Sequence, residues 1–374
     1  MRSTFAEPDS LDSELVGFFA EPAAVAAVRQ ARTERDPRPV YRLLGERRLL
    51  APAWPERLGG RDGSLVQAGA VAEQLAARDV PDLLHVISVQ TVGNLLLRGA
   101  PESLVTEIVP RLAAGRAFAA VLFTEPGAGS DLSSVITSAI VDDDAVVLHG
   151  EKVYGLVTSL CQHGLCLARV EGGRTPYDGL MLVLLDLTTP GVTITPVPSA
   201  WADPFHRVGL EDVRVPRGRV VAPPGQAWPL LLRTLALERT GIDYYSRARR
   251  WYALARERAE VLEIAGDADV LAALGRFGAR LNAARLLAYR TLSALDEGEP
   301  PDEMAATSKW YASELAADLA GWTSLRLGGT ADDADPLTHL IREAALEAPG
   351  MRISGGTSEM MLRTLAGACI GGAG

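Results

Sequence analysis

One short segment combines residue types that suit the binding of a flat or anionic ligand. The segment Phe123–Asp131 reads Phe-Thr-Glu-Pro-Gly-Ala-Gly-Ser-Asp and follows a predicted strand. Gly127 and Gly129 lack a Cβ, so backbone N–H groups can come close to such a ligand. The hydroxyl groups of Thr124 and Ser130 can donate hydrogen bonds to carbonyl or ring-nitrogen acceptors. Surface turns also contain these residue types, so the loop alone does not establish a binding site.

A second candidate for chemistry is the Glu238–Arg239 pair, which lies in a segment predicted to be a long helix. A helical Glu beside an Arg is usually a solvated ion pair on the surface. Here Ala236 and Leu237 precede Glu238 and Ile242 lies one turn further on, so this face of the helix is mostly apolar. A carboxylate partly buried on such a face holds a proton more readily, which suits a general base.

Composition limits the classes of function. The 374 residues are 48% hydrophobic and 22% charged, enough for two or three domains with a large core. A net charge of −10 argues against nucleic-acid binding, which needs a basic surface. The three cysteines form no CxxC pair, so we expect free thiols in a reducing compartment and no metal site. We find no signal peptide and no membrane-span pattern, and therefore expect a soluble, cytoplasmic protein.

Apolar periodicity predicts three domains. Residues 1–118 hold Ala-rich segments with a spacing near 3.6 residues, which is typical of helices. Residues 119–225 change to a period of two, which predicts a small antiparallel β domain with, among others, strands over Ser138–Val141, Leu180–Asp186 and Val213–Val220. Residues 226–374 return to long helices, the first over Trp228–Ile264, and four such helices imply a bundle. The predicted fold class is α+β.

Taken together, these segments resemble the acyl-CoA dehydrogenase family, and the resemblance covers nearly the whole chain. Phe123–Asp131 is similar to the Thr-Glu-Pro-x-Ala-Gly-Ser-Asp loop that lies against the flavin in that family. Gly150–Tyr154 resembles its Gly-x-Lys-x-Trp strand, whose aromatic residue flanks the flavin. Asp186–Val192 and Phe205–Pro216 resemble the turn and the strand pair that follow. The resemblance implies the family's N-terminal helical domain, middle β domain and C-terminal four-helix bundle.

The resemblance also implies the cofactor and the reaction. Members of the family desaturate an acyl thioester: a carboxylate base removes the α-proton, and FAD accepts the hydride from the β-carbon. The residues of this chain that match the family's cofactor-binding motifs are Phe123, Thr124, Gly129, Ser130, Tyr154, Arg256, Gly328, Gly329, Thr357 and Glu359.

The position of the base departs from the commonest family pattern. Many members carry a Glu directly before a Gly-Thr near the C-terminus, and here that position is Gly355, which cannot take a proton. A minority of the family has a glycine there and carries the base on the first bundle helix, in a Glu-Arg pair. The resemblance therefore implies that Glu238 is the catalytic base.

The motifs for the adenosine half of the flavin are less complete. In the family's Arg-x-x-Phe-Gly motif, Arg256 is kept but Phe-Gly is replaced by Ala259 and Glu260. Asp267 or Ala268 stands where a Gln is expected, and the Gln of the Gln-x-x-Gly-Gly loop is replaced by Leu325. Negative charge near a pyrophosphate is unfavourable unless another chain compensates for it. The pattern resembles one subunit of actinobacterial heterotetrameric dehydrogenases that act on bulky steroid side-chain thioesters.

These features predict an acyl-CoA dehydrogenase that uses FAD and acts on an acyl-CoA or an acyl-carrier-protein thioester, in lipid or secondary metabolism. Electron-transfer flavoprotein is the expected acceptor, and a homo- or hetero-oligomer is expected, with a second dehydrogenase subunit in the hetero-oligomeric case. One alternative is a non-catalytic or half-site partner subunit, which the altered adenosine motifs allow. Another is a flavin oxidase or monooxygenase on the same fold, against which the retained Glu238 argues.

Overall fold

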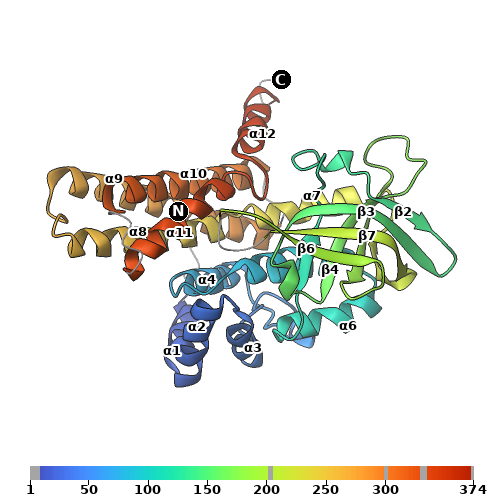
Figure 1. Cartoon of the computed structure of the whole chain (residues 1–374), viewed down its shortest axis with the longest axis horizontal. Coiled ribbons are helices and arrows are strands. Elements are labelled where there is room, and N and C mark those ends of the chain that lie inside the picture. Colours follow the sequence, from blue (N-terminus) through green and yellow to red (C-terminus); the bar gives the residue numbers. More distant parts are fainter. Residues whose placement is uncertain (1–8, 201–204, 299–301, 329–334, 372–374) are drawn as a thin grey trace. The chain divides into compact units, whose positions relative to one another are not determined.

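The structure is a computed structural model that describes residues 9–200, 205–298, 302–328 and 335–371 (Figure 1). The chain forms two compact units. One combines Met1–Ala20, Ser64–Val80 and Arg239–Gly374, and the other combines Glu21–Gly63 and Pro81–Glu238. We call them the bundle unit and the sheet unit. The domain boundaries predicted near residues 118 and 225 follow the apolar period and stay a prediction.

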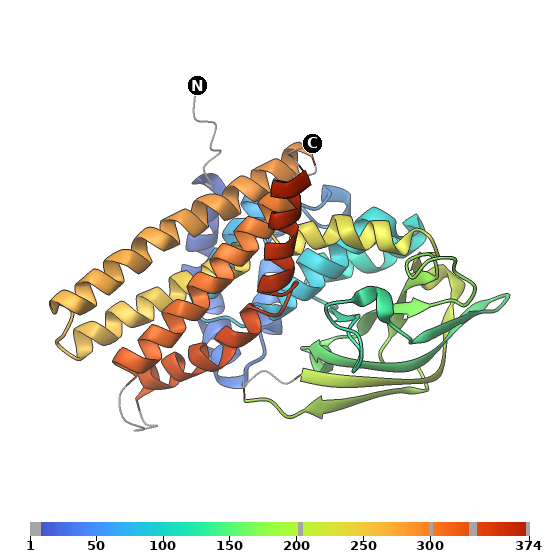
Figure 2. The same ribbon diagram turned by 90° about the horizontal axis from the view of Figure 1, so that it is seen from above.

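The bundle unit is helical throughout its described residues. Figures 1 and 2 show its longest helices side by side, and α10 packs on α8, α9, α11 and α12. Small Ala side chains, among them Ala248, Ala284 and Ala312, are fully buried and let these helices approach closely. The helices are α1 (Asp9–Ala20), α4 (Leu65–Ala76), α8 (Ile242–Val261), α9 (Ala268–Glu297), α10 (Asp302–Leu327), α11 (Pro336–Met351) and α12 (Ser358–Gly371).

The sheet unit contains the remaining helices. One of them, η2, is a buried π-helix, a form that is rare and frequent at functional sites. It packs on β1 and on α7, the strand and the helix that lead into the two candidate segments. The helices are α2 (Pro22–Glu34), α3 (Arg38–Glu46), η1 (Glu56–Leu58), η2 (His85–Gly93), α5 (Asn94–Gly99), α6 (Glu102–Ala113), η3 (Leu132–Ser134), η4 (Thr158–Leu160), η5 (Arg217–Arg219) and α7 (Ala227–Glu238).

Eight strands form one sheet in the order β6-β7-β3-β2-β4-β5-β8, with β1 paired to β4. The strands β4 and β5 are buried along almost their whole length, and alternate residues of β3 and β7 complete the core. The strands are β1 (Ala119–Leu122), β2 (Ser138–Val141), β3 (Ala145–Leu156), β4 (His163–Arg169), β5 (Leu180–Asp186), β6 (Val192–Val197), β7 (Phe205–Pro216) and β8 (Val220–Ala222).

The sheet is mixed rather than purely antiparallel as predicted, because β1 runs parallel to β4. A parallel pair needs a long connection, and the chain between these two strands includes the candidate loop and the β2–β3 hairpin. The strand predicted over Val213–Val220 is also wrong. Strand β7 ends at Pro216, since proline has no N–H to continue the ladder, and η5 separates it from β8.

The helix predicted over Trp228–Ile264 is two helices. Helix α7 ends at Glu238 and α8 begins at Ile242, with Gly241 between them at φ 79°. A Cβ on Gly241 would lie 2.6 Å from Ser308 Oγ and 2.9 Å from Ser308 O, so only glycine fits the break. In the described part of the chain, no helix is apolar enough over a sufficient length to cross a membrane.

Candidate active site

The loop predicted to bind a ligand is built as a tight turn at the end of β1. Phe123 and Glu125 are buried, whereas Thr124 between them is half-buried. The N–H of Glu125 donates to the carbonyl of Ala128 at 2.8 Å, and the N–H of Ala128 donates back to Glu125 at 3.1 Å. These two bonds close the turn and leave Ser130 exposed beyond it.

The glycines of this loop leave open space. A Cβ on Gly127 would meet nothing within 4 Å, and one on Gly129 would meet only Thr124 Cγ2, at 3.7 Å. The chain's own packing therefore requires neither glycine. Backbone N–H groups with no side chain over them, next to the hydroxyl groups of Thr124 and Ser130, suit a flat heteroaromatic ring with carbonyl and nitrogen acceptors.

Tyr154 presents an aromatic ring from strand β3. Its side chain is 57% exposed, and its ring meets Phe205 edge-on at 5.8 Å between centroids. The backbone of Tyr154 has φ 61°, which is unusual for a bulky residue, and the pairing of β3 with β7 is irregular between Lys152 and Gly155. A bulge of this kind re-aims a side chain, and it turns the Tyr154 ring out of the sheet while Lys152 stays buried.

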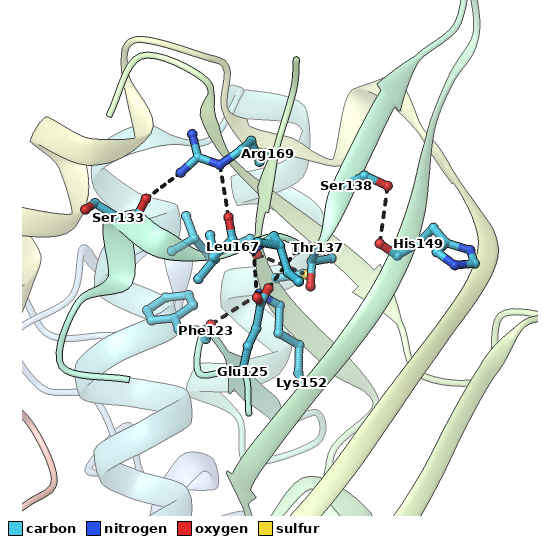
Figure 3. Close-up of polar contacts among 12 residues, drawn as sticks. Phe123, Glu125, Ser133, Thr137, Ser138, His149, Lys152, Leu167 and Arg169 are labelled. Carbon is cyan, nitrogen blue, oxygen red and sulfur yellow. Dashed lines mark hydrogen bonds and ion pairs between the residues drawn. The ribbon is translucent and has the colours of Figure 1, made fainter. Parts of the chain in front are cut away.

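Glu125 and Lys152 form a buried ion pair. Both lie in segments that resemble family motifs, but the sequence alone did not indicate that they pair. Lys152 Nζ lies 2.8 Å from Glu125 Oε1 and 3.2 Å from the carbonyl of Phe123 (Figure 3). Both side chains are almost fully buried. Burial alone raises the pKa of Glu125, but hydrogen bonds from the backbone and from Lys152 outweigh it and leave that pKa below its ordinary value.

Glu238 is the last residue of α7 and is half-buried beside the buried Leu237. The sequence placed it inside a continuous helix, and the structure places it at a helix end. A helix C-terminus carries the negative end of the helix dipole, which is unfavourable for an ionised carboxylate. The loop, Tyr154 and Glu238 all belong to the sheet unit.

Arg239 connects the Glu-Arg pair to the turn that lacks the usual base. Its Nε donates to the carbonyl of Gly355 at 2.9 Å, and Tyr244 Oη donates to the neighbouring carbonyl of Ser354 at 3.0 Å. Gly355 and Gly356 both have positive φ, 65° and 103°. Two side chains of the bundle unit therefore hold the turn by hydrogen bonds, and its backbone favours glycine at both positions.

The other predicted cofactor residues belong to the bundle unit, so the structure does not gather all ten in one unit. Thr357 caps helix α12, because its Oγ1 accepts from the N–H of Met360 at 3.2 Å, and Glu359 lies in the first turn of that helix. Arg256 is exposed on α8, and Gly328 follows α10. Gly329 lies outside the described residues.

Arg258 contacts the residue that precedes Gly328, whereas Arg256 was the predicted cofactor residue. Arg258 Nε donates to the carbonyl of Leu327 at 3.1 Å, and Nη1 lies 2.6 Å from Asp335 Oδ2. Arg256 is left at the surface among Glu257 and Glu260. The residues present fit the ring half of a flavin better than its adenosine half. Across residues 9–200, 205–298, 302–328 and 335–371, no grouping of acidic, His and Cys side chains could hold a metal ion.

Comparison with known proteins agrees with this geometry. The acyl-CoA dehydrogenase N-terminal, middle and C-terminal domain models match residues 9–116, 120–213 and 225–370. Acyl-CoA dehydrogenase FadE34 of Mycobacterium tuberculosis is 31% identical over 96% of this chain, which spans 49%, about half, of that protein. Acyl-CoA dehydrogenase IpdE1 of the same organism is 30% identical over 73% of each chain. The solved Tcur3481–Tcur3483 steroid ACAD has the same fold, with a TM-score of 0.85 at 23% identity and 97% of both chains covered.

The fold and the domain models define the class of protein as one built on the acyl-CoA dehydrogenase fold. The chain belongs to the acyl-CoA dehydrogenase family. The predicted family and its fold, N-terminal helices, a β domain and a C-terminal helical bundle, are confirmed.

Proposed function

We propose that this chain catalyses the FAD-dependent α,β-dehydrogenation of an acyl-CoA thioester, with Glu238 as the base that removes the α-proton. The observation that carries the proposal is where glycine and glutamate lie around Arg239. The turn it binds has Gly355 where a carboxylate is usual in the family, and the residue before it is a half-buried glutamate. The chemistry needs one carboxylate base, and Glu238 supplies it.

The loop and Tyr154 would hold the flavin ring. Thr124 and Ser130 offer hydroxyl groups, and Gly129 offers a backbone N–H without a covering side chain. Tyr154 offers an exposed ring that packs nearly perpendicular to the ring of Phe205. Bound FAD supplies the acceptor for the hydride that leaves the β-carbon. Phe123 contributes indirectly, because its buried side chain anchors the turn that carries Thr124.

The proton step needs only this chain. The α C–H bond breaks, the proton goes to a carboxylate oxygen of Glu238, and the electron pair becomes the second bond between the α- and β-carbons as the β-carbon loses its hydride. A half-buried position favours this role, since a partly desolvated carboxylate is a stronger base than a hydrated one. The retained base also supports dehydrogenation over an oxidase or monooxygenase reaction, which would not need it.

A second candidate is a half-site subunit of a heteromeric dehydrogenase. The specific observation in its favour is the adenosine side. Arg256 lies exposed with Glu257 and Glu260 beside it, while Arg258 is engaged by Asp335. A second chain would then supply positive charge for the pyrophosphate. The solved Tcur3481–Tcur3483 steroid ACAD, which has the same fold, carries a double name, and this suits such an arrangement. In either case we propose electron-transfer flavoprotein as the acceptor.

The test is the Glu238→Gln variant, which keeps size and hydrogen bonding but cannot accept the proton. General-base catalysis contributes about two to four orders of magnitude. We expect the variant to hold as much flavin as the wild type and to bleach that flavin more slowly by about that factor on anaerobic mixing with an acyl-CoA. Bleaching at the wild-type rate would place the base elsewhere.

A companion variant tests the flavin site without touching the base. Ser130→Tyr fills the open space at the loop and should strip bound FAD, measured as the ratio of flavin to protein absorbance. If the chain alone is flavin-poor and a co-expressed dehydrogenase subunit restores occupancy, the half-site arrangement is supported. Full FAD occupancy of the isolated wild-type chain would argue for a complete site of its own.

A further inference from the structure

We propose that the buried Glu125–Lys152 ion pair is a positioning device for the flavin ring, which locks the candidate loop to the strand that carries Tyr154. The proposal rests on the proposed function, because it concerns the geometry of the same site. Neither residue is placed in contact with the cofactor. They act through Thr124 on one side and Tyr154 on the other.

The first step of the argument is how the loop begins. Lys152 Nζ binds the carbonyl of Phe123 at 3.2 Å and the carboxylate of Glu125 at 2.8 Å. The next residue of β3, Val153, donates its N–H to the carbonyl of Thr124 at 2.9 Å. Each of the three residues that open the loop is thus bonded to Lys152 or Val153, so the position of Thr124 depends directly on this stretch of β3.

The second step is how the segment between the loop and β2 is held. The same Glu125 carboxylate accepts the N–H of Ile136 at 2.7 Å and the N–H of Thr137 at 2.8 Å. One side chain therefore joins the start of the loop, the segment that leads from the loop into β2, and strand β3. The segment between, with its glycines and Ser130, is closed at its base by Glu125, as Figure 3 shows for the residues around Lys152.

The third step is the direction of Tyr154. In a regular strand, residues two apart point to the same face, which would bury Tyr154 beside Lys152. The bulge separates them, so Lys152 is 1% exposed and Tyr154 is 57% exposed. The loop is bonded to Lys152 and Val153, and the next residue is Tyr154, so the loop and the aromatic ring both depend on this one short segment.

A charge pair is a costly way to obtain stability alone. Replacing a buried ion pair by neutral residues is often harmless to stability, whereas removing one partner leaves an uncompensated charge. What the pair adds here is a defined geometry, because the Glu125 carboxylate accepts hydrogen bonds from Lys152, Ile136 and Thr137. A neutral replacement should therefore preserve the fold and lose the geometry.

The experiment compares wild type, Glu125→Gln, Lys152→Met and the double variant Glu125→Gln/Lys152→Met. We expect the single variants to unfold at lower temperature and the double variant to recover most of the loss. The double variant should nevertheless bind FAD at least tenfold more weakly, by fluorescence titration of flavin-free protein, and lose the fine structure of the flavin absorption band.

The matched control is Asp186→Asn. It removes the negative charge 2.6 Å from Nδ1 of the buried His163, on the neighbouring strands β4 and β5, and should lower the unfolding temperature without changing FAD affinity. A double variant that binds FAD within twofold of wild type would overturn the proposal, and so would one that fails to fold, because the pair would then serve stability.

A second measurement separates failure of the proposed function from failure of this inference. If the wild type binds no FAD, alone or with a partner subunit, the flavin proposal fails while the loop can still be tested by amide hydrogen exchange. In flavin-free protein the double variant should then exchange Ala128–Ser130 and Tyr154–Gly155 at least tenfold faster than wild type, with Asp186→Asn unchanged. Equal exchange in all three proteins would overturn the positioning role.

Discussion

At the scale of single residues, the candidate site depends on which positions carry a carboxylate and which carry none. Gly355 has φ 65°, a conformation that costs a residue with a Cβ about 1 kcal/mol or more. Moving the base from Glu238 to that turn therefore needs more than an exchange of side chains. The glutamate before Arg239 lies at the end of a regular helix and meets no such backbone cost.

A buried histidine in the same unit leads to a pH prediction. His85 opens the π-helix η2, is almost fully buried, and has its Nε2 3.2 Å from the carbonyl of Leu50. Burial lowers its pKa from 6.5 to about 4. Between these pH values the unfolded chain binds a proton that the folded chain refuses, so the folded protein loses stability as the pH falls, by about 1.4 kcal/mol per unit.

The measurement is urea unfolding of wild type and His85→Gln from pH 7 to pH 4. Gln keeps a donor for Leu50 but does not titrate. We expect the free energy of unfolding of the wild type to fall more steeply with decreasing pH than that of the variant, with the difference levelling off below about pH 4. Parallel pH profiles would show that the His85 ring binds a proton as readily in the folded protein as in the unfolded chain.

At the scale of elements, the break between α7 and α8 matters because Glu238 is the last residue before it. The break depends on Gly241, whose missing Cβ leaves room for the backbone of Ser308 in α10. We expect Gly241→Ala to destabilise the protein by roughly 2–4 kcal/mol, since the left-handed backbone and the contact with a backbone atom both oppose it. Thermal unfolding measures the loss.

The control is the same substitution in the middle of α9. A Cβ on Gly275 would meet nothing within 4 Å, and alanine is the better helix former, so Gly275→Ala should stabilise the protein by about 0.5–1 kcal/mol. A loss of similar size in both variants would mean that the break is not specific to glycine. Opposite signs would support the geometry of the break.

At the scale of the whole molecule, apolar side chains on the bundle unit predict self-association or a partner chain. Leu325 is 91% exposed, Leu271 61% and Leu286 54%, on α10 and α9, with Ile353 at 65% before α12. Surfaces of this kind usually mark interfaces. We expect a dimer of dimers, with a mass of four chains by light scattering at micromolar concentration.

The variant Leu325→Asp, combined with Leu271→Asp, should shift the mass toward smaller species. Val25→Asp, at a 44% exposed position on α2 of the sheet unit, is the control and should leave the mass unchanged. A monomeric wild type, with or without a co-expressed dehydrogenase subunit, would refute the association.

How much of the fold and the candidate site could be predicted from the sequence depends on how close together in the chain the residues lie that determine each feature. The strands Ser138–Val141 and Leu180–Asp186 were predicted at their observed bounds, because alternating or continuous apolar runs between turn residues leave little choice. The loop with its two glycines and Glu238 were also singled out by local pattern and by resemblance, and their roles stay predictions. Each of these features is determined by neighbours along the chain.

Other features depend on residues far away in sequence, and only the tertiary structure decided them. Gly241 breaks a helix because Ser308 lies against it, and Tyr154 turns outward because β3 bulges against β7. Glu125 and Lys152, 27 positions apart, neutralise each other only after the loop has folded onto β3. Short-range propensity carries no information about such partners, since burial and pairing arise when distant segments pack together.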